Sequence, residues 1–136
     1  MNKEELTTFC TEWLEAWTGN DPDALISYYD ENALYSDPAH RAGLKGKDEI
    51  RRYFIKLLDV YRYWKWTPVE IFPISSGAIV KWTCEIPVGP EVIHEIGLDI
   101  VEITNKKITR NEVFFDRTRL VASVEKRRRD QRLINL

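Results

Sequence analysis

The sequence is poor in cysteine and histidine, the side chains that most often bind transition metals. It has two of each in 136 residues, and no CxxC or Cys/His pair has the spacing of a structural zinc site. Cys10 falls in a helical pattern and Cys84 in a strand pattern, so both are predicted to be free, buried thiols in a reducing compartment. We expect no metal site.

The sequence also lacks a strong charge of either sign and any long apolar segment. The formal net charge is −2, which argues against a general nucleic-acid or membrane surface. No apolar run approaches the roughly 20 residues that span a bilayer. The first ten residues, MNKEELTTFC, contain acids and no apolar signal-peptide core. We expect a cytoplasmic protein that binds neither nucleic acid nor membrane.

Aromatic residues, in contrast, are abundant. Five Trp, six Tyr and five Phe accompany a 43% hydrophobic and 31% charged composition, which is typical of a single soluble globular domain. Aromatic rings fill protein cores, and they also line small-molecule pockets. Composition alone does not decide between these two uses.

The first half of the chain is mainly helical in pattern. Residues 3–18 carry one apolar stripe at helical spacing, made of Leu6, Phe9, Cys10, Trp13, Leu14 and Trp17. Asp21-Pro22 predicts the start of a short second helix that ends near Asp30. A strand at 33–37, a polar loop and a third helix at about 47–62 follow.

The second half alternates between apolar and polar residues, as strands do. Strands are predicted at 64–74, 78–86, 92–103 and 108–116, with a hairpin turn at 104–107. Helices that precede antiparallel strands indicate an α+β fold. A bent sheet wrapped around the first helix would enclose a cone-shaped cavity. Residues 1–116 are predicted to form one domain, and the basic segment 117–136 a solvated, helix-permissive C-terminal extension.

The order and spacing of these elements resemble the NTF2-like superfamily, and within it the SnoaL-like and ketosteroid-isomerase-like proteins. The resemblance rests on WLEAWTGNDPDALISYYDENALYSDP, on the helix start GKDEI, and on GLDIVEI and ITRNEVFFD. It implies a strongly bent antiparallel sheet closed by helices into a cone around an apolar pocket. It also implies a homodimer that pairs through the outer face of the sheet.

The resemblance assigns roles to three residues. In isomerase-like members a carboxylate at the Asp-Pro position removes a proton next to a carbonyl, and Asp37 matches this position. Trp13 replaces the family's tyrosine donor; its indole N–H can donate a hydrogen bond but is no acid near neutral pH. Glu102 matches the protonated acid on the long strand that stabilises the enolate oxygen, a device known from ketosteroid isomerase.

Strand alternation extends this assignment to the rest of the pocket. If Glu102 faces the cavity, so do Ile100, Leu98, Ile96 and His94. On the last strand Asn111, Val113 and Phe115 share a face that would oppose them. The predicted ligand-binding residues are Trp13, Trp17, Tyr35, Tyr53, Trp82, His94, Leu98, Asn111 and Phe115, with Asp37 and Glu102 as catalytic residues.

Each of the polar candidates also has a purely structural interpretation. Asp37 before Pro38 fits an Asx-type turn, and His94 fits a histidine at the protein surface. Trp13 and Trp17 fit the core, and Asn111 fits a group that satisfies buried backbone.

Two functions are compatible with these patterns. In the first, a hydrophobic small molecule binds in the pocket and undergoes cofactor-free proton transfer, as in isomerisation, cyclisation or epoxide opening, with Asp37 as the base. In the second, the chain is a non-catalytic module that binds a ligand or a protein.

Overall fold

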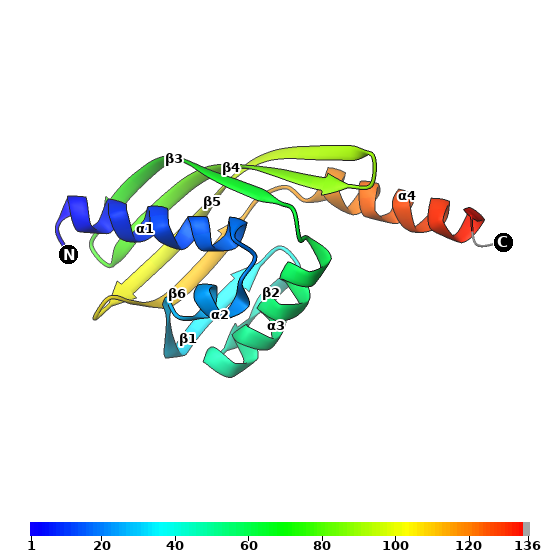
Figure 1. Cartoon of the computed structure of the whole chain (residues 1–136). Helices are drawn as coiled ribbons and strands as arrows, with labels where there is room; N and C mark the ends of the chain where they lie inside the picture. Colours follow the sequence, from blue (N-terminus) through cyan, green and yellow to red (C-terminus); the bar gives the residue numbers. More distant parts are fainter. Residues whose placement is uncertain (135–136) are drawn as a thin grey trace.

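The computed structural model describes residues 1–134 and contains four helices and one six-stranded sheet (Figure 1). The elements are α1 (Lys3–Thr18), α2 (Pro22–Ile26), β1 (Tyr29–Asp37), β2 (His40–Lys45), α3 (Lys47–Val60), β3 (Lys65–Ile74), β4 (Gly77–Val88), β5 (Glu91–Thr104), β6 (Lys107–Phe114) and α4 (Thr118–Ile134). The strand order is β2-β1-β6-β5-β4-β3. The predicted α+β fold is confirmed.

Two helices cover the concave side of the sheet. α1 packs on β3 and β4, whereas α3 packs on β1 and β2, so that together they close the two ends of the curve (Figure 1). The predicted stripe of α1 is buried, with Cys10 and Trp13 fully inaccessible. Cys84 on β4 is buried as well, and both thiols are free. The core therefore lies between α1 and the sheet.

The β1–β2 region differs from the sequence prediction. β1 begins at Tyr29, four residues earlier than expected, and β2 occupies the segment that was predicted to be a polar loop. β2 is an edge strand whose residues are exposed or half-buried, so its sequence has no alternating apolar pattern to reveal it. β1 pairs in parallel with β6, which places Tyr35 opposite Asn111.

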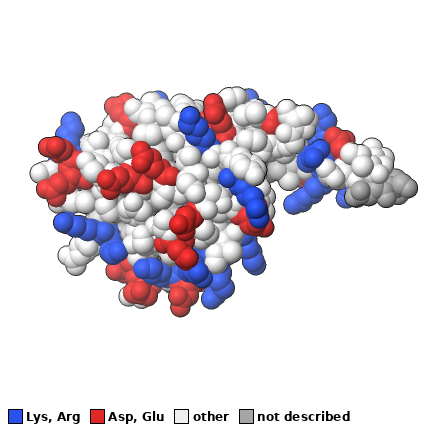
Figure 2. Space-filling view, viewed as in Figure 1, with Lys and Arg blue, Asp and Glu red and all other residues white. Residues whose placement is uncertain are grey.

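The last helix extends away from the body of the molecule. Only Leu120 and Ser123 of α4 are buried, and basic side chains gather along its outer part (Figure 2). Within residues 1–134, no helix is both long enough and apolar enough to cross a membrane.

Gly97 provides space for a tryptophan at the centre of the sheet. It pairs with Trp82 across β4 and β5. A Cβ atom at position 97 would lie 2.5 Å from the Phe114 carbonyl oxygen and 2.6 Å from the Trp82 ring. Both distances are far shorter than van der Waals contact, so the Trp82 ring can lie over this strand only because residue 97 has no side chain.

We therefore expect Gly97→Ala to lower the free energy of unfolding by about 1–3 kcal/mol, the usual cost of overpacking a filled core. Urea denaturation measures this change. Gly19→Ala is the matched control, because a Cβ there would meet nothing closer than 3.5 Å. Equal stabilities for the two variants would contradict the packing argument.

Candidate functional site

A cavity of about 110 Å³ lies between the concave face of the sheet, α1, α3 and the start of α4. Its wall is mainly aromatic, being formed by Trp17, Tyr35, Tyr53, Tyr61, Trp64, Trp66, Trp82 and Phe115. Two carboxyl groups, Asp37 and Asp99, also line it. A small apolar space with a few polar groups is the usual form of a ligand site.

The predicted site residues fall into three groups. Six of them line the cavity, namely Trp17, Tyr35, Asp37, Tyr53, Trp82 and Phe115. Trp13 and Asn111 are fully buried next to it and are connected to it by hydrogen bonds. His94, Leu98 and Glu102 lie outside the cavity, so the prediction that they face it is wrong.

Asp37 both closes a turn and lines the cavity. One of its oxygens, Oδ1, accepts hydrogen bonds from the backbone N–H groups of Ala39 and His40, both at 2.9 Å. The other, Oδ2, accepts from the hydroxyls of Tyr35 at 2.9 Å and Tyr53 at 2.5 Å. Two oxygens have about four acceptor positions, so protein donors occupy the whole carboxylate.

The wrong face of β5 was predicted because Glu102, matched through the resemblance, was taken as the inward residue. β5 itself alternates without a break: its pairing with β4 is continuous from Gly77–Glu102 to Val88–Glu91 and places Asp99 opposite Val80 and Val101 opposite Ala78. Directly opposite residues of an antiparallel pair lie on the same face, and Val80 and Ala78 are buried. Asp99 and Val101 therefore point inward, and the residues predicted to do so, His94, Ile96, Leu98, Ile100 and Glu102, point outward. The bulge in the β5–β6 pairing lies on β6, where Thr109 is the extra residue.

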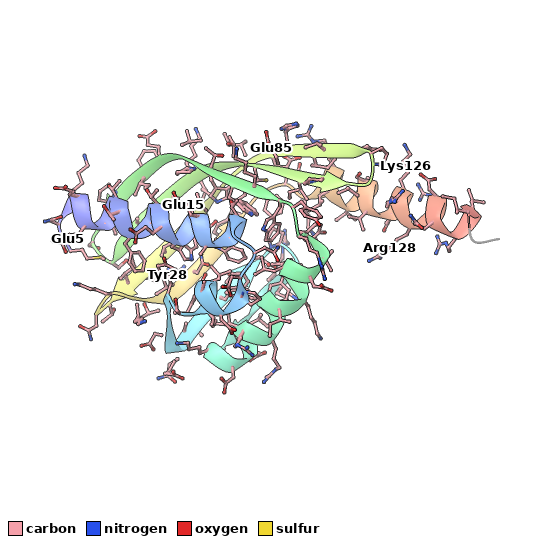
Figure 3. The ribbon with its side chains drawn as sticks, viewed as in Figure 1. Glu5, Glu15, Tyr28, Glu85, Lys126 and Arg128 are labelled. Carbon is pink, nitrogen blue, oxygen red and sulfur yellow. The ribbon has the colours of Figure 1, made fainter. Side chains whose placement is uncertain are left out.

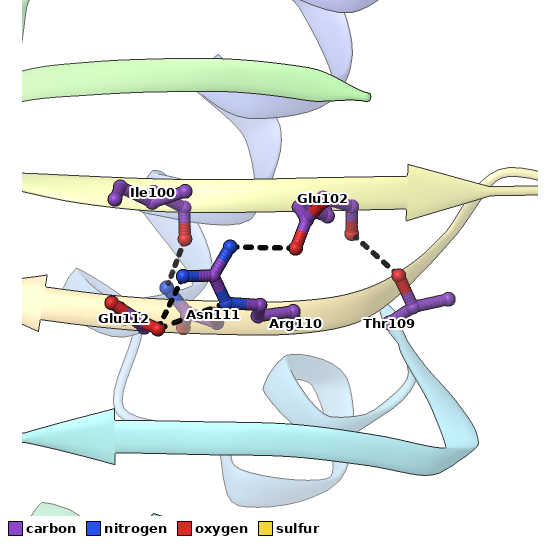
Figure 4. Close-up of polar contacts among 6 residues, drawn as sticks. All are labelled: Ile100, Glu102, Thr109, Arg110, Asn111 and Glu112. Atoms are coloured by element: carbon purple, nitrogen blue, oxygen red, sulfur yellow. Dashed lines mark hydrogen bonds and ion pairs between the residues drawn. The ribbon is translucent and has the colours of Figure 1, made fainter. Parts of the chain in front are cut away.

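Glu102 lies on the outer face of the sheet in an ion-pair network (Figure 4). Its carboxylate accepts a hydrogen bond from Arg110 Nη1 at 2.7 Å, and Arg110 also binds Glu112. Hydrogen bonding to Arg110 lowers the pKa of Glu102, which is opposite to the protonated acid expected from the resemblance. His94 is exposed on the same strand, and its carbonyl oxygen accepts a hydrogen bond from Arg119.

Asp99 is the acid of β5 that lines the cavity, and the prediction missed it because Glu102 was taken as the inward residue. It is only 3% exposed. Trp82 Nε1 donates to its Oδ1 at 2.7 Å, and Asn111 Nδ2 donates to its Oδ2 at 2.8 Å. Burial raises the pKa of Asp99 to about 7, against the opposing effect of these hydrogen bonds, and the negative charge of Asp37 adds to the rise.

A chain of buried hydrogen bonds leads from Trp13 to Asp99, and each member donates to the next one. An indole nitrogen can only donate, so Trp13 Nε1 donates to the hydroxyl oxygen of Tyr29 at 3.1 Å. The Tyr29 hydroxyl then donates to Asn111 Oδ1 at 2.8 Å, which leaves the Asn111 amide nitrogen to face Asp99. Because Trp82 is also an indole, both buried partners of Asp99 are donors. Neither can accept a proton from it.

Trp66 contributes a further polar group. It lines the cavity, and its indole nitrogen is buried without a hydrogen-bond partner among residues 1–134. An unpaired buried donor costs about 1–3 kcal/mol. An acceptor atom on a bound molecule is one way to satisfy it.

The sequence matches the family model of the SnoaL-like domain over residues 10–111. The chain belongs to the SnoaL-like family. The matched range contains Asp37, Asp99 and the whole hydrogen-bonded chain from Trp13 to Asn111, whereas α4 lies beyond it. A comparison with curated protein sequences finds no match.

Solved structures confirm the NTF2-like cone for this SnoaL-like chain. A protein with a ketosteroid isomerase-like fold from Catenulispora acidiphila, in complex with trimethylamine, is 17% identical with a TM-score of 0.77, covering 86% of this chain and 92% of that one. TerC, co-crystallised with polyporic acid, is 14% identical with a TM-score of 0.76, covering 88% and 98%. The epoxide hydrolase/cyclase-like enzyme SalBIII is 19% identical with a TM-score of 0.74, covering 86% and 95%.

The raised pKa of Asp99 predicts how the stability of the protein depends on pH. The unfolded chain releases this proton near the ordinary value of 3.8, whereas the folded protein holds it until about pH 7. The stabilisation is therefore complete below about pH 4 and is lost as the pH rises to about 7.

We expect the unfolding free energy of the wild type, relative to Asp99→Asn, to fall across this window by at most about 1.4 kcal/mol per pH unit. Urea denaturation between pH 4 and pH 8 measures this difference. The substitution also changes the hydrogen bonds, which adds an offset, so only the slope tests the prediction. A difference that stays constant with pH would contradict it.

Proposed function

We propose that the chain binds a small hydrophobic carbonyl compound in the aromatic cavity and catalyses cofactor-free proton transfer next to the carbonyl. Asp99 is the acid and Asp37 is the base. The observation that carries this proposal is the position of Asp99, a buried carboxyl group with a raised pKa that lines the cavity and whose buried partners are both donors.

The two hydrogen-bond partners of Asp99, Trp82 and Asn111, determine where its proton can point. A neutral carboxyl group has one O–H donor and keeps acceptor capacity on both oxygens, so it retains the hydrogen bonds from Trp82 and Asn111. Since neither partner accepts, the O–H is left for a group inside the cavity. A ligand carbonyl oxygen there would receive a hydrogen bond that strengthens as negative charge develops on it.

The two aspartates provide an acid and a base in one small space. Asp37 is surrounded by four donors, whereas Asp99 is desolvated and holds its proton near neutrality. Unlike environments of this kind separate the roles of two carboxyl groups. Asp37 takes the proton from the carbon next to the carbonyl, and Asp99 stabilises the resulting enolate oxygen. Before it does so, Asp37 has to release one phenol hydroxyl.

The comparisons support a small organic ligand. TerC and the Catenulispora acidiphila protein were crystallised with such molecules, and SalBIII is described as an epoxide hydrolase/cyclase-like enzyme. The space of about 110 Å³ is smaller than the several hundred Å³ of most ligand pockets. A single ring is the upper limit for this space, since cavities near 150 Å³ bind benzene, and any substituent has to extend toward the rim.

The hydrogen bonds of Asp37 favour a second candidate function, a binding module without catalysis. All acceptor positions of that carboxylate are in use, so a base role requires a rearrangement that binding alone does not.

Hydrogen–deuterium exchange separates these two functions. We expect the protein to accelerate exchange of the methyl protons of acetophenone in D₂O, followed by NMR. Asp37→Asn and Asp99→Asn should each lower the rate about 100-fold or more, the usual contribution of general acid–base catalysis. Glu102→Gln is the matched control and should leave the rate within about twofold, because Glu102 lies on the outer face of the sheet.

The indole N–H resonances of Trp66 and Trp82 report binding in the same samples. Shifts of these resonances without exchange would identify a binding module. Neither shifts nor exchange with acetophenone would reject the proposed function.

We also propose that two copies pair through the outer face of the sheet. Ile96 on β5 and Phe114 on β6 are 54% and 49% exposed there, next to Leu98. A contiguous exposed apolar face is typical of an interface between subunits.

The dimer proposal predicts that Ile96→Glu shifts the protein toward the monomer, because the new carboxylate would be buried in the interface. Sedimentation equilibrium measures the change. Leu133→Glu, at an exposed apolar position on α4 away from the sheet, is the control. A wild-type monomer at high protein concentration would contradict the proposal.

A further inference from the structure

The rim of the cavity is built by residues outside the family match. The rim residues that line the cavity are Arg117, just before α4, and Leu120 and Val121 in the first turn of that helix. The SnoaL-like match ends before them, at residue 111. Leu120 is buried, so this segment is part of the closed surface of the cavity. The rim therefore lies outside the residues that the family model matches.

Contacts along β5 hold this segment in place. Arg119 binds the carboxylate of Glu95 at 2.8 Å and the carbonyl oxygen of His94. Further along α4, Ser123 and Lys126 both contact the carboxylate of Glu91, at 3.2 and 3.3 Å. These residues recur at helical spacing and so hold one side of α4 against the strand. The first half of α4 is thereby held against β5, with Lys126 near the β4–β5 hairpin (Figure 3).

Arg117 is the cationic residue in the cavity wall. Within residues 1–134 it forms no ion pair, whereas Arg119 and Lys126 on the same segment both do. Its positive charge acts on the hydroxyls of Tyr53 and Tyr61, whose pKa values are raised mainly by burial and lowered in part by Arg117. Arg128, further along α4, also lowers the pKa of Tyr61.

The charges are thus separated along the cavity. The carboxylate of Asp37 is buried at the end of β1 and Asp99 holds its proton near neutrality, whereas Arg117 is exposed at the rim. An anionic group would be repelled from the interior and attracted to the rim. A guanidinium group also binds a carboxylate through two parallel hydrogen bonds.

We propose that the ligand is a small cyclic carbonyl compound that carries a carboxylate, and that Arg117 binds this carboxylate at the rim while the ring and carbonyl enter the cavity. This inference rests on the proposed function and adds the class of substrate and its orientation. The cavity volume of about 110 Å³ leaves space for no more than the ring and its carbonyl, so the charged group stays at the solvent boundary.

Two isosteric probes test the charge requirement, namely 4-acetylbenzoate and 4-acetylbenzamide. Tryptophan fluorescence gives their dissociation constants, because four tryptophans line the cavity. We expect the wild type to bind the carboxylate at least about tenfold more tightly than the amide. Arg117→Gln should remove this preference and leave the affinity for the amide unchanged, whereas Arg117→Lys should retain part of it. Arg132→Gln, in the exposed last turn of α4, is the control.

The outcomes separate the two proposals. Equal affinity of the wild type for both probes, or an unchanged preference in Arg117→Gln, overturns the inference about the ligand and leaves the cavity proposal standing. Failure of both probes to bind overturns the inference together with the proposed function.

Discussion

The continuous pairing of β5 with β4 is the constraint on which the site depends. Because Asp99 lies opposite Val80 and Val101 opposite Ala78, both share the buried face of β4, whereas Glu102 joins Arg110 outside. A shift of this pairing by one residue would exchange the two faces of β5 and bring Glu102 to the inner side in place of Asp99. The register of two neighbouring strands thus decides which carboxyl group is desolvated.

The buried hydrogen bonds determine how the carboxyl group of Asp99 can be protonated, because both of its partners donate to it. Trp13 and Trp82 can only donate, so the orientations of Tyr29 and Asn111 between them are determined. Networks of this kind are stable only when every member is satisfied, and here each member is. The hydrogen bonds from Trp82 and from the Trp13–Tyr29–Asn111 chain both end at the carboxyl group of Asp99, which otherwise faces the cavity.

Most of the fold, and half of the site, could be predicted from the sequence. The stripe from Leu6 to Trp17 and the Asp21-Pro22 helix start are local signals. Trp17 and Trp82 follow from the helix and strand patterns, whereas Asp37 was assigned through the resemblance. β2 was missed because an exposed edge strand has no alternating apolar residues. Asp99 was missed because the inward face of β5 was assigned from Glu102, which the resemblance placed in the cavity, whereas the pairing with β4 puts Asp99 opposite the buried Val80.

The division of the cavity between two segments has a consequence for engineering. The acids and the aromatic wall come from residues 10–115, whereas the rim comes from α4. Exchanging the C-terminal helix for a different one would therefore alter which molecules are admitted while the reactive groups keep their positions. On the proposed function, the residues that admit a ligand and the residues that react with it could therefore be changed separately.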